Sequence, residues 1–372
     1  MNRTIDNKIR VLYIIGEDTT TSIPLEVAGA IDDDRVQLLV AAYYGGDNRS
    51  ELVDIPVIHL DVQGPADLRG PYKVYECIRK YQPDVVHVHH TVSAFWGSIL
   101  GKVFGGAQIV RTEHDDHRYY SIGQHMANLI SIASSDMVIC NSKDTYNNLK
   151  LWEQKIARSK FDVVYNGIDI DRIDRAHSGA SSFRKQLGVP EDYTLIGSVG
   201  RLIPQKNFEA LLRSMPNVLE SEPEVHLAIL GEGPRRDRLE HVIEEESLER
   251  YVTLFGEVSR DDVFSFLHAS DLFVVPSSWE GFCNAAVEAM AAGKPMVVSD
   301  ISTLREVVGE AAVFVDADQP TDICKGILHL IGSGPESLRS IGRRLRERAI
   351  GRYSLSRTSE KYVENYLSVA TK

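Results

Sequence analysis

The sequence predicts an α/β protein built from two doubly wound domains. The chain has 372 residues, whereas a single hydrophobic core stops growing at about 250–300 residues, which favours two domains. Short runs of β-branched residues alternate with longer amphipathic stretches along the chain. Nearly continuous apolar strands separated by helices are typical of parallel sheets covered on both faces. Two such series therefore predict two doubly wound domains.

The expected strands fall into two series separated by a polar stretch at residues 168–192, which is rich in Ser and Gly as linkers are. We expect a first domain over residues 1–180 and a second over residues 181–352. The segment 353–372 has the pattern of an amphipathic helix, and we expect it to pack back on the first domain. The strands are expected at residues 9–16, 36–43, 84–89, 107–114, 136–142 and 162–167, then at 194–201, 225–233, 252–258, 271–277, 294–300 and 311–316.

Composition narrows the function classes. The net charge of −12 argues against extended contact with nucleic acid, which needs a basic surface. No stretch approaches the ~18–20 apolar residues that a membrane span needs. No leader pattern precedes the first strand, so we expect a cytoplasmic protein. Reduced thiols are expected for the four cysteines, which form no CxxC pair: Cys77, Cys140, Cys283 and Cys324.

The motif with the clearest chemistry is PSSWEGFCNAAVEAMAAGKPMVVSD, residues 276–300. It predicts a strand, a loop and then a helix that begins near Asn284. The first amides of a helix lie at the positive end of its dipole, where a diphosphate is stabilised. Gly281 allows close approach of backbone to ligand. Glu280 can accept hydrogen bonds from sugar hydroxyls and Glu288 from a ribose diol; two surface carboxylates without function are the alternative.

A second motif, SVGRLIPQKNFEALLRSM, covers residues 198–215. Arg201 and Lys206 lie in a short loop between an expected strand and an expected helix. An arginine can bind two phosphate oxygens at once, and a lysine adds a mobile point charge. Both would stabilise negative charge on a departing nucleoside diphosphate. A solvated basic loop is the alternative.

Histidines end two strands of the first domain. His114, in VRTEHDDHRYY (residues 110–120), lies beyond the carboxyl end of a strand, where open α/β sheets bind ligands. His87 and His89, in VVHVHH, point to the same face of their strand. An HxH pair can bind zinc, but we favour packing at the strand end. Further zinc ligands could come from His114, Asp115, Asp116 or His117.

Together these motifs resemble the retaining glycosyltransferases of family 4, which have the GT-B fold, and the resemblance covers nearly the whole chain. EGFCNAAVE matches the E-x7-E motif of that family, with Glu280 and Glu288 at its ends. GRLIPQKN is similar to its G-R-L-x-x-x-K-N motif, and TEHD to its T-x-H-D segment. YNGID (165–169) and GEGP (231–234) occur in the expected order.

The resemblance implies two Rossmann-like domains facing each other across a cleft that closes during the reaction. It implies a retaining hexosyltransferase that uses a UDP- or GDP-sugar and a glycan or lipid-linked acceptor, with no metal and no cofactor. Arg201 and Lys206 would hold the diphosphate, Glu280 the sugar and Glu288 the ribose, with His114 at the reaction centre. The other implied donor contacts are Gly281, the backbone of Phe282, Cys283 and Asn284, the backbone around Val258, and the glycines Gly231 and Gly16.

Gly16 marks a departure, because the family often has two adjacent glycines where this chain reads IIGEDTTTSIP (14–24). Two other functions stay open. One is a metal-dependent hydrolase that uses His87, His89 and His114. The other is a different GT-B enzyme, such as a nucleotide-sugar epimerase or a phosphorylase. The sequence does not identify the sugar, the nucleotide or the acceptor.

A lipid-linked acceptor would bring the first domain to the inner face of the cell membrane. A basic and aromatic surface is the candidate for peripheral contact, although a solvated helix is the simpler interpretation. Its residues are Lys143, Lys150, Trp152, Lys155, Arg158 and Lys160.

Overall fold

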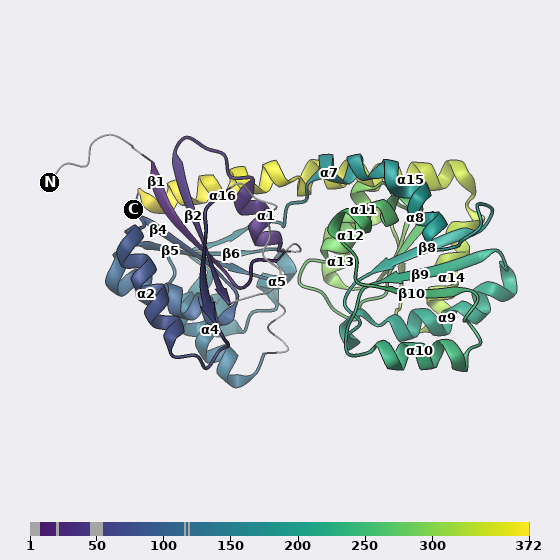
Figure 1. Ribbon diagram of the computed structural model, residues 1–372, viewed down its shortest axis with the longest axis horizontal. Coiled ribbons are helices and arrows are strands. Elements are labelled where there is room, and N and C mark those ends of the chain that lie inside the picture. The colour runs from purple at the N-terminus through teal and green to yellow at the C-terminus, as the bar shows by residue number, and fades with distance from the viewer. Residues whose placement is uncertain (1–7, 20–21, 45–54, 115–116, 118–119, 372) are drawn as a thin grey trace. The chain divides into compact units, whose positions relative to one another are not determined.

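The computed structural model describes residues 8–19, 22–44, 55–114, 117 and 120–371. The chain forms two compact units (Figure 1). The first contains residues Met1–Gly167 and Leu355–Lys372, and the second contains Ile168–Ser354. Each unit is built on one parallel sheet with helices on both faces, as the two series of apolar runs predict.

The first unit has a seven-stranded parallel sheet in the order β3-β2-β1-β4-β5-β6-β7. The order reverses between β1 and β4, so the loops after these strands lie at the switch point of the sheet. The strands are β1 Ile9–Ile15, β2 Val36–Tyr44, β3 Val57–Val62, β4 Val85–His89, β5 Gln108–Glu113, β6 Met137–Cys140 and β7 Phe161–Val163. The helices are α1 Ile23–Gly29, α2 Arg69–Tyr81, α3 Thr91–Leu100, η1 Gly101–Gly105, α4 Ile122–Ser134, α5 Lys143–Asn147, α6 Leu151–Ala157 and α16 Leu355–Ala370.

Strand β3 is the one element of the first sheet that the apolar runs do not predict. Among the described strands it pairs with β2 alone, at the edge of the sheet. Its sequence VIHLDV alternates apolar and polar residues and follows Pro56. Because an edge strand has one neighbour and is only partly covered, it needs no continuous apolar run.

Helix α16 completes the core of the first unit. Tyr362, Val363, Tyr366 and Val369 are buried in the same cluster as residues of β1, β2 and α1. The last helix of the chain therefore lies on the sheet formed by the first residues, as its amphipathic pattern predicts. The opposite face of that sheet is covered through a separate cluster that contains residues of α2 and α3.

The second unit has a six-stranded parallel sheet in the order β10-β9-β8-β11-β12-β13. Its strands are β8 Thr194–Val199, β9 Val225–Leu230, β10 Val252–Gly256, β11 Leu272–Val275, β12 Met296–Ser299 and β13 Val313–Val315. Its helices are α7 Ile170–Arg175, η3 Ala176–Gly179, α8 Ala180–Gln186, η4 Pro204–Lys206, α9 Phe208–Ser221, α10 Arg236–Glu245, α11 Arg260–Ala269, α12 Asn284–Ala291, α13 Ser302–Val308, η5 Gly309–Ala311, α14 Pro320–Gly332 and α15 Gly334–Tyr353.

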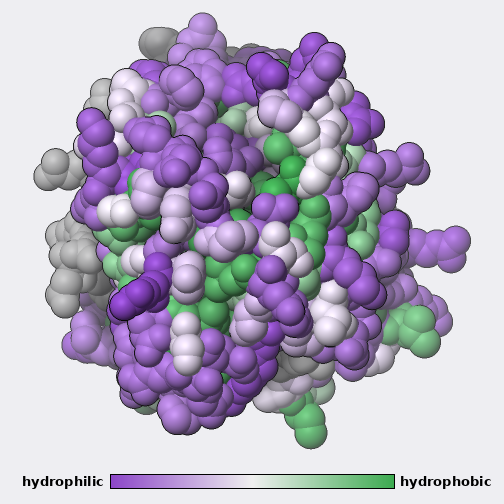
Figure 2. Space-filling view, turned by 90° about the vertical axis from the view of Figure 1, so that its right-hand side faces the viewer, coloured by the Kyte–Doolittle hydropathy of each residue, from purple (hydrophilic) through white to green (hydrophobic). Residues whose placement is uncertain are grey.

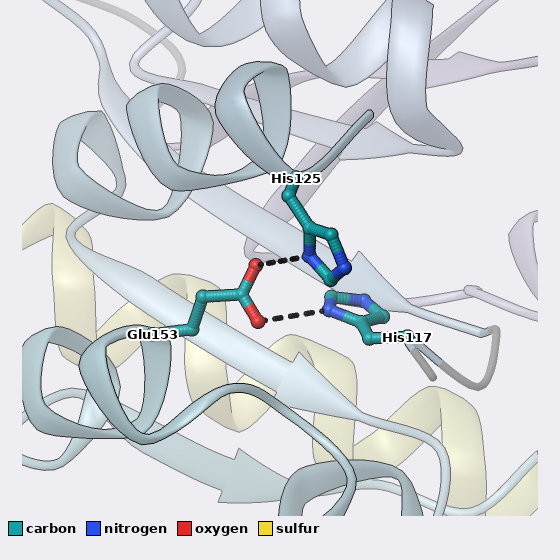
Figure 3. Close-up of side chains that lie close together, drawn as sticks. All are labelled: His117, His125 and Glu153. Atoms are coloured by element: carbon teal, nitrogen blue, oxygen red, sulfur yellow. Dashed lines mark hydrogen bonds and ion pairs between the residues drawn. The ribbon is translucent and has the colours of Figure 1, made fainter. Parts of the chain in front are cut away.

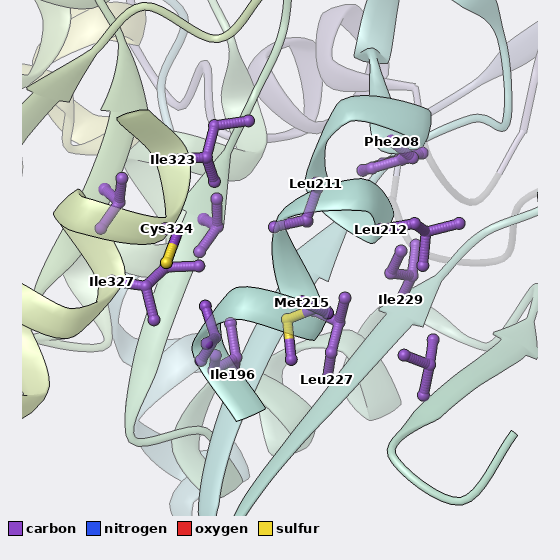
Figure 4. Packing of buried hydrophobic residues seen from close by; sticks show 14 of the residues in the cluster. Ile196, Phe208, Leu211, Leu212, Met215, Leu227, Ile229, Ile323, Cys324 and Ile327 are labelled. Carbon is purple, nitrogen blue, oxygen red and sulfur yellow. The ribbon is translucent and has the colours of Figure 1, made fainter. Parts of the chain in front are cut away.

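The surface and the core of the second unit are clearly separated. The face shown in Figure 2 is mainly hydrophilic, with apolar residues confined to narrow bands. The largest core cluster joins one face of the sheet to α9, α10 and α14, and Figure 4 shows how Leu211, Met215, Leu227 and Ile327 pack within it. The smaller cluster on the other face contains residues of α8 and α11.

The boundary between the units lies at residues 167 and 168, earlier than the expected boundary at 180 and 181. The stretch expected to be a linker is helical, because α7 buries Ile173 completely. Its backbone is also bound by the second unit. The Oγ atom of Ser265 donates to the carbonyl of Ala176 at 3.3 Å, and the Nε2 atom of His268 lies 2.8 Å from the carbonyl of Ile173.

Two glycines of α15 provide a matched test of how closely this helix packs against the backbone at Gly293. A Cβ atom at Gly342 would lie 2.0 Å from the carbonyl oxygen of Gly293, whereas a Cβ atom at Gly351 would meet nothing within 4 Å. We expect Gly342→Ala to lower the free energy of unfolding by about 1–3 kcal/mol through overpacking. Gly351→Ala should raise it by up to about 1 kcal/mol through helix propensity. Urea unfolding followed by circular dichroism measures both changes. Equal effects of the two substitutions would contradict the close contact between α15 and Gly293.

Candidate functional site

The loops that follow β8 and β11 lie side by side, because these two strands are neighbours in the second sheet. The backbone N–H of Ser278 donates to the carbonyl of Gln205 at 2.9 Å. The Nε2 atom of Gln205 donates in turn to the carbonyl of Trp279 at 3.0 Å. The two motifs that the sequence singled out, residues 198–215 and 276–300, are therefore in direct contact.

Glu280 and Lys206 form an ion pair at this junction. The Nζ atom of Lys206 donates to Oε1 of Glu280 at 2.5 Å, and the Oγ atom of Ser277 donates to the same oxygen at 2.7 Å. The Glu280 side chain is only 6% exposed. Burial disfavours the charged form of Lys206, but the adjacent carboxylate outweighs this effect and raises the pKa of the lysine. The lysine is therefore charged at neutral pH.

The backbone beside this pair adopts a rare conformation. Cys283 precedes the first residue of α12 and has φ +73°, a region that non-glycine residues seldom occupy and that is often associated with functional sites. Helix α12 begins at Asn284, as the motif predicts. Burial raises the pKa of the Cys283 thiol, which is therefore protonated at neutral pH and is not a nucleophile.

The neighbours of Cys283 have different roles. The side chain of Phe282 is buried, with its ring 5.5 Å from that of Tyr353 in an edge-on contact. Only the backbone of Phe282 can therefore meet a ligand. Gly281 and Asn284 are half-buried on either side of this buried pair. The structure thus brings together the expected donor contacts of residues 280–284.

Glu288 is buried on α12 and is ion-paired with Arg260, with Nη1 and Oε1 2.6 Å apart. The guanidinium of Arg260 also lies over the ring of Phe264, 5.1 Å from its centre. Sequence reasoning missed Arg260, because the contact depends on α11 and α12 lying beside each other. Val258 is half-buried, two residues before Arg260, and packs against the smaller core cluster.

Arg201 and Gly231 occupy the loops after β8 and β9. Arg201 is exposed, and no ion pair joins its guanidinium to any of the residues that the structure describes. Gly231 has φ +136°, and a Cβ atom there would lie 2.0 Å from the carbonyl oxygen of Gly200. Glycine is therefore required for these loops to approach each other, which makes Gly231 a structural residue whatever it contacts in a ligand.

In the first unit, His114 and Gly16 lie at the carboxyl edge of the sheet. The Nε2 atom of His114 is 2.8 Å from Nδ1 of His89, and its ring is stacked 5.5 Å from that of His90. A Cβ atom at Gly16 would lie 2.9 Å from the His90 ring. Burial, followed by His90, lowers the pKa of His114 to about 3, so the imidazole is neutral at pH 7. Sequence reasoning did not assign His90 a role.

Among the residues that the structure describes, His87 is not part of a cluster that could bind a metal ion. Its Nδ1 atom is 2.7 Å from the hydroxyl of Tyr366, and its Nε2 atom is 2.7 Å from that of Thr112. With both ring nitrogens hydrogen-bonded, His87 links α16 to the sheet, in agreement with the packing interpretation of VVHVHH. The observed contacts do not support a zinc site made of His87, His89 and His114, and Asp115 and Asp116 lie outside the described residues.

Two family models match the chain. Residues 25–172 match Glycosyltransferase Family 4, and residues 180–348 match Glycosyl transferases group 1. Among curated proteins, an uncharacterised glycosyltransferase of Methanocaldococcus jannaschii is 36% identical over 172 residues, which are 45% of this chain and 44% of that protein. The UDP-Gal:alpha-D-GlcNAc-diphosphoundecaprenol alpha-1,3-galactosyltransferase of Escherichia coli is 25% identical over 257 residues. Those residues are 67% of this chain and 66% of that protein.

Solved structures show the same fold at low sequence identity. Sucrose-phosphate synthase from Thermosynechococcus elongatus has a TM-score of 0.83 at 19% identity, covering 98% of this chain and 100% of that one. HepE of Anabaena in complex with UDP-glucose has a TM-score of 0.81 at 20% identity, covering 97% and 100%. The fold is therefore GT-B. The two family models together span both units, and the chain belongs to the group 1 glycosyltransferases, with a first unit of family 4 type.

Proposed function

We propose that this chain is a retaining glycosyltransferase. It moves a hexose-type sugar from a UDP- or GDP-sugar to a hydroxyl of a glycan or lipid-linked acceptor. The observation that supports this most strongly is the largely buried Lys206–Glu280 pair at the N-terminus of α12. Nucleotide sugars are also named for two similar proteins, UDP-Gal for the Escherichia coli galactosyltransferase and UDP-glucose for the HepE complex.

The proposed roles follow from charge and position. Lys206, Arg201 and the positive end of α12 stabilise the charge that develops on the departing diphosphate. Glu280 accepts hydrogen bonds from hydroxyls of the transferred sugar, and its position is set by Lys206 and Ser277. Glu288, held by Arg260, accepts hydrogen bonds from the ribose. His114 contributes a neutral imidazole from the first unit to the substrate.

Arg201 offers a clear mutational test, because it is exposed and its replacement leaves no buried charge unpaired. We expect Arg201→Ala to weaken donor binding about 10- to 100-fold, because a hydrogen bond to a charged group is worth about 1.5–3 kcal/mol. Thermal-shift titration with UDP- and GDP-sugars measures the change, since a bound ligand raises the melting temperature. Arg344→Ala, at an exposed arginine of α15, is the control. Equal affinity in the two variants would contradict the role of Arg201.

Retention of configuration and independence from metal are further parts of the proposal. Glu280 already receives two hydrogen bonds at one oxygen, which suits a carboxylate that binds hydroxyls better than a free nucleophile. We expect the first-formed product to keep the anomeric configuration of the donor, as read by NMR. Transfer should also persist in EDTA, because Arg201, Lys206 and α12 supply the positive charge at the diphosphate. An inverted product, or activity that chelation abolishes and a divalent ion restores, would contradict these points.

We also propose that the first unit contacts membranes when the acceptor is lipid-linked. Among the described helices none is long and apolar enough to cross a bilayer, so such contact would be peripheral. Ten of the eleven large apolar side chains that are exposed among the described residues lie in the first unit. On α4 they recur every four residues, and on α6 they flank Lys155. These α4 and α6 side chains are Ile122, Met126, Ile130, Leu151, Trp152 and Ile156.

Not all of the basic side chains expected on this surface are available for membrane contact. Lys150, Lys155 and Arg158 are exposed beside the apolar residues. Lys160, in contrast, donates from Nζ to the carbonyls of Ile132 and Ser135 at the end of α4, at 2.8 and 2.5 Å. Its role is therefore to cap that helix, and we remove it from the candidate surface.

Vesicle co-sedimentation tests the membrane surface. Ile122 is 84% exposed and Leu151 is 83% exposed, so Ile122→Ser with Leu151→Ser should leave the fold unchanged. We expect this double variant to lose binding to anionic vesicles at low salt, because the apolar contact is removed. Ile350→Ser, at the one large exposed apolar residue described in the second unit, should bind as the wild type does. Failure of the wild type itself to bind would refute the surface.

A further inference from the structure

A buried polar cluster in the first unit has no part in the proposed transfer reaction. It consists of His117, which follows β5, His125 on α4 and Glu153 on α6 (Figure 3). The side chains of His117 and Glu153 are fully buried, and that of His125 is 13% exposed. Each residue offers one ligand atom, and these three atoms lie within 4.8 Å of one another.

Two of the polar atoms in this cluster face each other without a hydrogen bond. They are Nδ1 of His125 and Oε1 of Glu153, which are 3.6 Å apart and shielded from solvent. That separation exceeds the usual range of a hydrogen bond. Leaving a buried polar atom without a partner costs about 1–3 kcal/mol, and native proteins keep few such atoms. Two of them directed at the same point therefore indicate a ligand that both could bind.

The neighbours of His117 and Glu153 hold these residues in position. The Nε2 atom of His117 is 2.9 Å from Oε2 of Glu113, and Glu113 is itself paired with Arg111. Metal-binding histidines are commonly oriented in this way, by a carboxylate on the ring nitrogen that does not bind the ion. The backbone N–H of Lys150 donates to Oε2 of Glu153 at 2.8 Å, which leaves Oε1 directed toward His125.

We propose that His117, His125 and Glu153 bind a divalent transition-metal ion, with zinc as the best match. Imidazole nitrogens and carboxylate oxygens are ligands that zinc prefers. The Nδ1 atom of His117 is 3.2 Å from Oε2 of Glu153, and the Nδ1 atom of His125 is 3.6 Å from Oε1 of the same carboxylate. Ligand atoms about 2.0–2.1 Å from a tetrahedral ion are separated by similar distances. A water molecule can supply the fourth position.

Such an ion would be structural and separate from donor chemistry. Its ligands come from three elements, so it would tie α4 and α6 to the end of β5. The same two helices carry the exposed apolar surface described above, and the rings of His125 and Trp152 are 6.2 Å apart. The proposal does not depend on the Lys206–Glu280 site, which lies in the other unit.

The alternative is a metal-free ion-pair network. Burial disfavours protonation of His117, but Glu113 and Glu153 outweigh it and raise the pKa of this histidine to about 9. A protonated His117 could then bridge the two carboxylates. The Nδ2 atom of Asn128 also lies 3.0 Å from Nδ1 of His117. This network would leave Nδ1 of His125 without a hydrogen bond, whereas a metal ion would bind that atom.

Metal content and cobalt spectroscopy on the full chain separate the two models. The protein should be produced without a histidine tag, depleted with a chelator and titrated with zinc or cobalt(II). We expect about one metal ion per chain, a visible absorption band typical of tetrahedral cobalt(II), and a higher melting temperature with zinc. An unchanged melting temperature together with no cobalt band would overturn the proposal, whatever the outcome of donor-binding assays.

Substitutions at and beside the proposed ligands test where the metal ion binds. His125→Gln should abolish the cobalt band, and Glu113→Gln, which replaces the carboxylate that orients His117 with a neutral amide of the same size, should weaken zinc binding about 10- to 100-fold. The matched control is His241→Gln, because His241 forms an exposed pair with Glu245 at 3.1 Å in the second unit. Circular dichroism without metal verifies that each variant is folded. A cobalt band that persists in folded His125→Gln, or disappears in His241→Gln, would refute the assignment.

Discussion

The ion pair between the Lys206 ammonium group and the Glu280 carboxylate, largely buried where two loops meet, is the interaction on which the proposed donor site depends. Lys206 comes from the loop after β8 and Glu280 from the loop after β11, and their contact of 2.5 Å joins the two motifs. Removing one partner of a buried pair leaves an uncompensated charge and costs about 3–5 kcal/mol. The pair therefore holds the start of α12 in place and also sets the electrostatic potential that a diphosphate would meet there.

The second glutamate of the same motif is also held by an ion pair. Glu288 is buried and paired with Arg260 from α11, so each carboxylate of the motif is matched by a cation from another segment. Both glutamates are thereby held in a fixed orientation, with oxygen atoms that can accept hydrogen bonds from hydroxyl groups. The glycine at 231 allows a third loop to approach, because its missing side chain makes room for the carbonyl of Gly200. The site is thus a set of loop ends fixed by charge pairs and close backbone contact.

Much of this arrangement could be predicted from the sequence, and the rest depends on contacts that no local pattern reveals. Buried parallel strands gave continuous apolar runs, and the start of α12 at Asn284 followed from the strand–loop–helix motif. Strand β3 was missed because an edge strand needs no such run. Arg260 and His90 were missed because their partners are distant in sequence. The boundary was expected too late, since the polar appearance of residues 168–180 hid the buried Ile173.

The central claim is that Lys206 and Glu280 act as one unit in binding the donor. A double-mutant cycle tests it directly, with donor affinity measured by calorimetry in the wild type, Lys206→Met, Glu280→Gln and the variant that carries both changes. Because the double variant leaves no buried charge unpaired, it should be the easiest of the three variants to fold. The account predicts that both single variants bind the donor less tightly than the wild type does. The double variant should bind it about as tightly as the single variant with the lower affinity, which corresponds to a coupling energy of about 0.5–3 kcal/mol. Strictly additive losses, or wild-type affinity in the double variant, would contradict it.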